Sequence, residues 1–349
     1  MLALGLVIVH AAAAYSAPAD TIRSGGWSGG RYPNERSKPF QYCGASAKNS
    51  SDITMNLSLD RDYRWRLAFS HPHWEFVGGS PISMTLGLGS GKQSLAGVAT
   101  VANPSTLDFQ PEDPLALFPS LWTASQLKVV SGGFRFEFEL LGASDVLTAL
   151  TQCVWRQLGR SPRARPANPP ADVPGAIRDE AKGVAEMLIA YARFTNPNDR
   201  SPPALQSGAR SAAAWQVGLV TSTIDIVPAG RTPQPDGVTV EVIDTDARNC
   251  RGGFFFAKSL QVKDSVSLGR VFTSCQSAEA SALSYYVVAP RAKGGFYLFS
   301  SRVDVPIIGA AMQQRVSDVD ARIRDVVLTA IRQAEEEQTK AGAAAKTTE

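Results

Sequence analysis

The sequence predicts an α+β protein of two domains, each a mainly antiparallel β-sheet with a few packed helices, and three observations lead to this expectation. The chain has 349 residues, about twice the usual size of one domain. Runs of alternating apolar and polar residues, typical of half-buried strands, are bounded by Gly, Pro and Ser. A stretch rich in Pro and Arg at 156–175 removes backbone donors and predicts an extended linker. The domains therefore fall at 20–155 and 176–334.

The overall composition limits the class of protein. Hydrophobic residues make up 44% and charged residues 19%, which is ordinary for a globular protein and excludes a collagen-like or disordered chain. The net charge of +3 comes without a clustered basic face, so we expect no nucleic-acid partner.

The first 19 residues have the pattern of a signal peptide. Residues 2–14 are apolar and nearly uncharged, and Ala17 and Ala19 occupy the small-residue positions before a cleavage site. Cleavage there gives a chain that begins at Asp20, and an earlier cut gives one that begins at Tyr15. No Lys or Arg precedes the run, so either the true start lies upstream or the signal is atypical. The run is shorter than the roughly 20 residues that span a bilayer, so we expect a periplasmic or secreted protein without a transmembrane segment in the mature chain.

Four cysteines are an even number, which in an exported chain indicates disulfides. Three pairings are open in principle. The domain boundary separates the cysteines two and two, which favours Cys43 with Cys153 and Cys250 with Cys275. A zinc site is disfavoured, because the chain has no Cys-x-x-Cys pair and no His near a cysteine at ligand spacing.

In the first domain, residues 63–69 alternate large apolar side chains with small or charged ones, which predicts a half-buried strand. Further strands are expected at 82–88, 95–101, 127–130 and 134–138. A short helix over 113–121 is expected to carry Leu117 and Leu121 inward. Ser144 is the expected N-cap of a closing helix that ends near Cys153.

The second domain is expected to open with a helix at 176–194 and to close with one at 312–333. Strands are predicted between them at 215–226, 238–243, 253–257, 270–274, 283–288 and 296–301. With helices at both ends, we expect the helices to pack on one face of the sheet. Residues 196–211 read as a long loop, and residues 335–349 as a disordered tail.

Several short segments of the first domain resemble a module of exported proteobacterial proteins of unknown function. They are residues 40–45 (FQYCGA), Trp65, residues 74–78, residues 134–140 and residues 150–154 (LTQCV). The resemblance covers about 130 residues and consists mostly of core and disulfide positions, so it implies no catalytic residue. The second domain resembles no family that we can name.

Two histidines of the expected mature chain, His71 and His73, stand two residues apart, and His10 falls in the expected signal peptide. On an extended backbone both imidazoles point to one side and could share a metal ion, although Glu75 would point to the other side. One of them would also have to be the base of a Ser/His/Asp hydrolase. The favoured interpretation is a solvated turn.

Three further patterns resemble functional motifs, but turns and strands explain them better. Residues 87–92 (GLGSGK) depart from a phosphate-binding loop at both ends and predict a hairpin turn. Ser125 and Lys128 have Ser-x-x-Lys spacing, but they run into a strand and no Lys-Thr-Gly follows. The sequence Gly-Gly-Phe occurs at 132–134, 252–254 and 294–296, where paired glycines suit tight turns.

An apolar groove for a ligand is the remaining candidate site, formed by Phe254, Phe256, Phe296 and Tyr297 at the end of the second sheet. We expect no catalytic, cofactor-binding or metal-binding residue. The favoured function is a non-enzymatic exported protein that binds an unknown protein or an envelope component. The alternative is a secreted hydrolase or metal-binding protein that uses His71 and His73.

Overall fold

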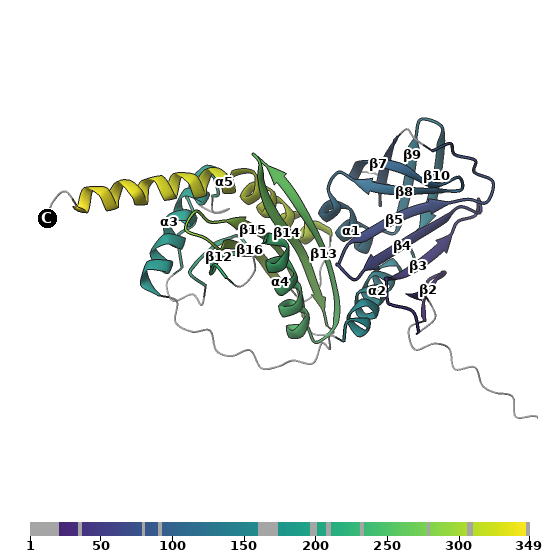
Figure 1. Cartoon of the computed structure of the whole chain (residues 1–349), viewed down its shortest axis with the longest axis horizontal. Helices are drawn as coiled ribbons and strands as arrows, with labels where there is room; N and C mark the ends of the chain where they lie inside the picture. Colours follow the sequence, from purple (N-terminus) through teal and green to yellow (C-terminus); the bar gives the residue numbers. More distant parts are fainter. Residues whose placement is uncertain are drawn as a thin grey trace, which may run out of the picture.

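The computed structural model describes residues 21–33, 37–78, 81–89, 93–159, 174–195, 201–206, 211–230, 234–277, 280–305 and 310–346. Within them the chain forms two antiparallel sheets, of ten and six strands, and five helices (Figure 1). The α+β class is as expected. The expected signal peptide, residues 160–173 of the expected linker and most of the expected loop at 196–211 lie outside the described residues.

The first sheet is formed by residues 22–139 and has the strand order β1-β2-β3-β4-β5-β8-β7-β6-β9-β10. Its strands are β1 (Ile22–Ser24), β2 (Trp27–Tyr32), β3 (Tyr42–Lys48), β4 (Thr54–Asp60), β5 (Trp65–Ser70), β6 (Ile82–Leu88), β7 (Gln93–Asn103), β8 (Thr106–Pro111), β9 (Gln126–Ser131) and β10 (Phe134–Glu139). Two helices accompany it, α1 (Pro114–Thr123) and α2 (Ala143–Gln157).

This sheet folds back on itself around an aromatic core. The ring of Phe69 in β5 contacts those of Phe136 and Phe138 in β10 at centroid distances of 5.3 and 5.9 Å. Asn49, in the turn after β3, donates its side-chain amide to the carbonyl oxygen of Glu137 in β10. Strands distant in the sheet order therefore face each other across the core.

The second sheet is formed by residues 213–305 and has the strand order β11-β12-β16-β15-β14-β13. Its strands are β11 (Ala213–Val217), β12 (Val220–Val227), β13 (Gly253–Lys263), β14 (Val266–Gln276), β15 (Ser281–Pro290) and β16 (Phe296–Val305). Its helices are α3 (Gly175–Ala192), α4 (Pro235–Asn249) and α5 (Ala310–Lys346).

The two helices predicted for this half, α3 and α5, contact each other and lie on one face of the second sheet, as expected, but the unpredicted helix α4 covers the other face. Consecutive residues of a strand point to opposite faces. In β15, the hydroxyl of Tyr286 donates to Asp246 of α4, whereas Tyr285 lies beside Asp320 of α5. The central sheet is therefore one layer of three.

Two predicted strands of this half are also corrected. Residues 238–243 belong to α4, not to a strand. Alternating valines gave the strand pattern, but Pro235 begins a helix, and the buried Val238, Val242 and Ile243 lie on its inner face against β14. The predicted strand at 215–226 is the β11–β12 hairpin, which turns at Gly218 with a φ of +60°.

Helix ends differ from expectation in two places. Gly142, with a φ of +75°, occupies the N-cap of α2, and Ser144 lies inside the helix. Helix α5 continues to Lys346, well past the expected end near Gln333, so residues 335–346 are helical rather than a disordered tail. The last turns carry Ala, Glu, Gln and Lys, all strong helix formers, which explains the extension.

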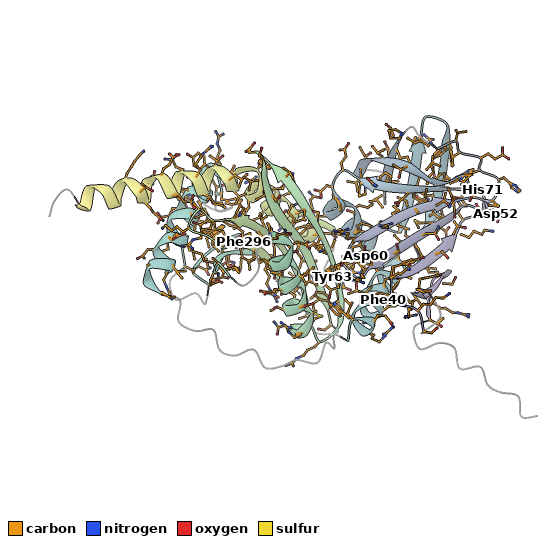
Figure 2. All side chains as sticks on the ribbon, viewed as in Figure 1. Phe40, Asp52, Asp60, Tyr63, His71 and Phe296 are labelled. Carbon is orange, nitrogen blue, oxygen red and sulfur yellow. A yellow bond between two sulfur atoms is a disulfide. The ribbon has the colours of Figure 1, made fainter. Side chains whose placement is uncertain are left out.

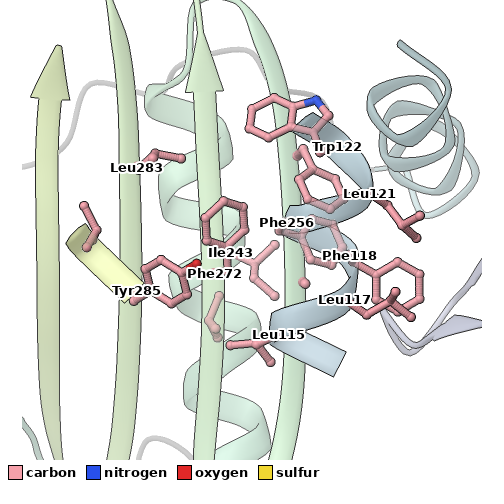
Figure 3. Packing of buried hydrophobic residues seen from close by; sticks show 14 of the residues in the cluster. Leu115, Leu117, Phe118, Leu121, Trp122, Ile243, Phe256, Phe272, Leu283 and Tyr285 are labelled. Atoms are coloured by element: carbon pink, nitrogen blue, oxygen red, sulfur yellow. The ribbon is translucent and has the colours of Figure 1, made fainter. Parts of the chain in front are cut away.

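The two halves share one contiguous hydrophobic cluster. Helices α1 and α2 of the first half pack against β13, the edge strand of the second sheet, as Figure 3 shows for α1. Asp113, the N-cap of α1, also accepts hydrogen bonds from Arg270 of β14 at 3.1 Å. We call this contact region, formed by α1, α2, Tyr63, Trp65 and β13, the joint.

Candidate functional site

The predicted aromatic groove is not formed at β13, because its phenylalanines belong to the joint. The Phe254 ring stacks on Trp155 of α2 at 5.0 Å, and the Phe256 ring meets Tyr63 edge-on at 4.9 Å. Trp65 donates its indole N–H to the carbonyl oxygen of Phe256 at 2.8 Å. These contacts cover the outer edge of β13 and bury its rings.

The other two groove residues lie in β16, in two different environments. Phe296 packs on Val238 and Val288 and borders a recess of about 600 Å³ whose described lining has no charged side chain. Tyr297 is buried and donates its hydroxyl to Glu180 of α3 at 2.7 Å. The four predicted residues therefore do not share one groove.

Glu180 is the centre of a buried ionic cluster. Its carboxylate accepts hydrogen bonds from Arg291, Lys293 and Tyr297. The Arg291 guanidinium, more than the other donors, holds the pKa of Glu180 at about 2 against the opposing effect of burial. Arg291 and Tyr297 are themselves largely buried, whereas Lys293 is exposed, and together they fasten α3 to β16 and to the loop after β15, so the carboxylate has a structural role.

His71 and His73 lie in the turn after β5. Figure 2 shows His71 at the end of the first sheet that is remote from the joint. Their rings are 5.4 Å apart, and the Nδ1 of His71 accepts the backbone N–H of His73, which closes the turn. Asp52 lies near them, but its pKa is lowered mainly by its ion pair with Lys48. No three metal-ligating side chains gather anywhere in the described part of the chain.

The glycines of the glycine-rich patterns lie in turns or where two backbone segments come close. Gly89 has a φ of +62° in the β6–β7 turn, and the remainder of that turn, residues 90–92, lies outside the described residues. Gly132 and Gly133 connect β9 to β10, and residues 294–295 lie in the β15–β16 turn with positive φ. The pair Gly252–Gly253 does not form a hairpin turn, because Gly252 directly precedes β13. A Cβ at Gly252 would lie 1.8 Å from the carbonyl oxygen of Gln276, so this position has no room for a side chain.

Ser125 and Lys128 do not form a nucleophile site. Lys128 lies in β9 and forms an ion pair with Glu137 of β10 at 3.4 Å. The Ser-x-x-Lys chemistry needs the Ser at the start of a helix, and this segment is a strand.

The four cysteines form two disulfides, Cys43 with Cys153 and Cys250 with Cys275, in the favoured pairing. The first ties β3 to α2, and the second ties the end of α4 to β14. Beside the second lies a recess of about 220 Å³, where the partly buried Asp246 accepts hydrogen bonds from Thr273 and Tyr286, and burial raises its pKa. This volume is below that of ordinary ligand sites.

A larger recess on the solvent face of the first sheet was not predicted. It has a volume of about 670 Å³, within the range of about 300–1,000 Å³ typical of small-molecule sites. We call it the small-residue groove. It is lined by Tyr32, Gln41, Tyr42, Gly44, Ala45, Ser46, Asn56, Leu57, Ser58, Asp60, Arg66, Ala68, Ala102, Thr106 and Asp108.

The floor of the groove follows from strand alternation. In β4, Met55, Leu57 and Leu59 are buried, so Asn56 and Ser58 face outward. Cross-strand pairing extends this floor in two rows, Ser46–Asn56–Ala68–Asp108 and Gly44–Ser58–Arg66. Short side chains in adjacent strands leave the sheet surface hollow.

Two tyrosines form one end of the groove. The rings of Tyr32 and Tyr42 stack at 5.0 Å with an interplanar angle of 13°, and each residue is 36% exposed. A Cβ at Gly44 would lie 3.2 Å from the Tyr42 ring and 3.4 Å from the Tyr32 ring. The absence of a side chain at Gly44 therefore allows both rings to lie over the strand.

The charged residues in the described lining of the groove are Arg66, Asp60 and Asp108. Partial burial raises the pKa of Asp108, and Arg66 opposes this shift. Asp60 accepts the backbone N–H groups of Asp62 and Arg64 through one carboxylate oxygen. The groove thus offers one cation, two carboxyl groups and several neutral hydrogen-bonding groups.

The chain was also compared with known proteins. No protein-family model and no curated protein matches it. Among solved structures, it is similar to invasion-associated protein B from Bartonella henselae, at 16% identity and a TM-score of 0.28, covering 40% of this chain and 98% of that one. It is also similar to a candidate outer membrane protein from Bacteroides fragilis, at 8% identity and a TM-score of 0.09, covering 80% and 88% respectively. Likenesses this weak assign neither family nor activity.

Proposed function

We propose that the protein is an exported, non-enzymatic binding protein that holds a polar ligand, an envelope component or part of a partner, in the small-residue groove. One observation carries this proposal. Solvent-facing positions of a sheet usually carry long polar or β-branched side chains. Ser46, Ser58 and Ala68 instead leave a hollow of ligand size over paired strands, bounded by the two tyrosine rings that lie over Gly44.

Two disulfides support the exported part of the proposal, because they persist in oxidising compartments such as the periplasm. The apolar start of the chain supports it as well. Among the described residues, no helix has the length and apolar character needed to cross a bilayer. Mass spectrometry of the protein from its native host should find the mature N-terminus near Asp20 or Tyr15, and an intact Met1 in a cytoplasmic fraction would contradict export.

We further propose that the two halves are separate domains joined through 156–175, since each has its own sheet and its own disulfide. The hydrolase or metal alternative at His71 and His73 is supported only by the contact between the two rings. It therefore remains second to the groove.

Binding at the groove can be tested with one substitution and a matched control. Ser58→Trp places a large ring on the groove floor at a solvent-facing strand position, and Thr85→Trp makes the same change on an exposed position of β6 outside the groove. In a thermal-shift screen of small polar compounds, we expect ligands that stabilise the wild type and Thr85→Trp but not Ser58→Trp. A complete absence of such ligands would refute the proposal.

A further inference from the structure

We infer that the ligand of the small-residue groove is a neutral oligosaccharide, lying across the strands of the first sheet. This inference rests on the proposed binding function and specifies its ligand class. It follows from the charge, the lining, the aromatic pair and the strand arrangement of the groove.

The charge of the groove disfavours an anionic ligand. Among the lining residues that the structure describes, Arg66 is the one basic side chain, and Asp60 and Asp108 carry two carboxyl groups. Phosphate groups and acidic polysaccharides are bound where several Lys or Arg side chains converge. This lining has more carboxyl groups than basic groups, so a ligand without negative charge fits it better.

The lining also disfavours an acyl chain. Leu57, its largest aliphatic residue, is buried with its side chain in the core, and the outward-facing side chains of the floor are hydroxyl, amide, small and charged groups. Ser46, Ser58 and Asn56 can both donate and accept hydrogen bonds. Sugar hydroxyls have the same double capacity, so a polyhydroxylated ligand can satisfy these groups and can also donate hydrogen bonds to the carboxyl groups of Asp60 and Asp108.

The stacked pair of Tyr32 and Tyr42 provides the apolar component that a sugar ring needs. A tyrosine ring combines an apolar face with a polar hydroxyl and stays well ordered at a binding surface. The C–H face of a pyranose can pack on such a ring while its hydroxyls reach polar neighbours. At the Tyr42 end those neighbours include Asp60, which pairs with Tyr42 across β3 and β4.

The strand arrangement indicates an extended ligand and argues against a peptide. The groove is lined from β2 to β7 through β3, β4, β5 and β8, all of which are paired on both sides. Five strand spacings of about 4.8 Å each amount to roughly 24 Å, enough for several sugar units. A peptide commonly gains affinity by adding a strand to a free edge, and these interior strands offer none.

A printed array of neutral and anionic glycans, followed by calorimetry with chitotetraose, cellotetraose and maltotetraose, tests the ligand class. We expect binding to at least one neutral glycan, a loss of affinity of at least tenfold in Ser58→Trp and in Tyr42→Ala, and unchanged affinity in Thr85→Trp. The unfolding midpoint of each variant, measured in parallel, separates lost binding from lost folding.

The outcomes separate this inference from the proposed function. If polyphosphate, a peptide or an acidic glycan binds in the groove and no neutral glycan does, the inference is wrong and the binding function stands. If a neutral glycan binds equally to Ser58→Trp, the groove is not its site and the inference also fails. If neither the array nor the compound screen gives a ligand sensitive to Ser58→Trp, both fail.

Discussion

At the scale of single residues, His71 and His73 are close enough to share a ligand, yet their contacts are those of a turn. We predict that His71→Ala combined with His73→Ala changes the free energy of unfolding by no more than about 0.5 kcal/mol, because solvated turn residues contribute little. Urea denaturation measures this. Loss of a phenotype in the native host, with an unchanged unfolding midpoint, would instead favour the hydrolase or metal alternative.

Removal of the Glu180 carboxylate, unlike removal of the two imidazoles, should destabilise the fold. The Glu180 pKa of about 2 in the folded protein lies below the ordinary value of 4.5, so its contribution to stability is present above pH 4.5 and is lost as the pH falls toward 2. We predict that Glu180→Gln costs on the order of 2 to 3 kcal/mol at pH 6, because Arg291 loses its buried partner.

Urea denaturation from pH 6 to pH 2.5 checks this pH dependence. The stability difference between wild type and Glu180→Gln should shrink as the pH falls. Lys48→Met, which breaks the exposed pair with Asp52, is the control and should cost less than about 1 kcal/mol. An equal loss for Glu180→Gln at both ends of the pH range would show that the cluster acts by packing alone.

Residue types alone could not reveal the groove. Arg66 and Ala68 fall within a predicted strand, but β3, β4 and β8 were not predicted as strands. The groove depends on the register between these strands, which is set by long-range packing. A row of Gly, Ser and Ala also gives no signal of its own, since the same residues are common in turns.

At the scale of elements, a sequence pattern predicted the correct secondary structure where the local preference of the residues agreed with their tertiary packing. The strand predicted at 82–88 is β6 to the residue, because alternation and turn residues define both ends. The strand predicted at 238–243 is part of α4, where burial against β14 outweighs the β preference of three valines. Local alternation cannot distinguish these cases without the tertiary contacts.

The disulfides connect elements over loops of different length, which predicts unequal stabilisation. The Cys43–Cys153 bridge spans 110 residues and Cys250–Cys275 spans 25. On the chain-entropy model, replacing both cysteines of the first pair by Ser should cost about 5 kcal/mol, and of the second about 3.5 kcal/mol. Urea denaturation of the two double variants checks the order. A larger loss for the second pair would indicate that local packing, not loop closure, dominates.

At the scale of the whole molecule, the run Phe254–Phe256 shows what a sequence cannot distinguish. Three consecutive aromatic residues indicate burial on both faces of a strand, but a ligand groove and a contact between sheets bury them equally. In the structure, Phe255 packs on Trp122 and Trp65 on one face of β13, while Phe254 and Phe256 contact Trp155 and Tyr63. The joint therefore accounts for the run.

The joint leads to a prediction about cooperativity. Trp155 is 4% exposed, stacks on Phe254 and donates its indole N–H to the hydroxyl of Tyr63, which in turn donates to Asp244 of α4. If the two halves are domains coupled through this contact, the wild type should unfold in one transition. Trp155→Ala should cost about 3 to 5 kcal/mol and resolve two transitions, because a cavity opens between the halves.

Differential scanning calorimetry measures both effects, and Phe299→Ala is the matched control. Phe299 is a large buried ring in β16 of the second sheet, and it is not part of the joint. Its removal should lower the unfolding temperature by a similar cavity effect while the two halves remain coupled. A single transition for Trp155→Ala, as cooperative as that of Phe299→Ala, would mean that both sheets form one folding unit. The boundary at 156–175 would then separate two sheets of a single domain.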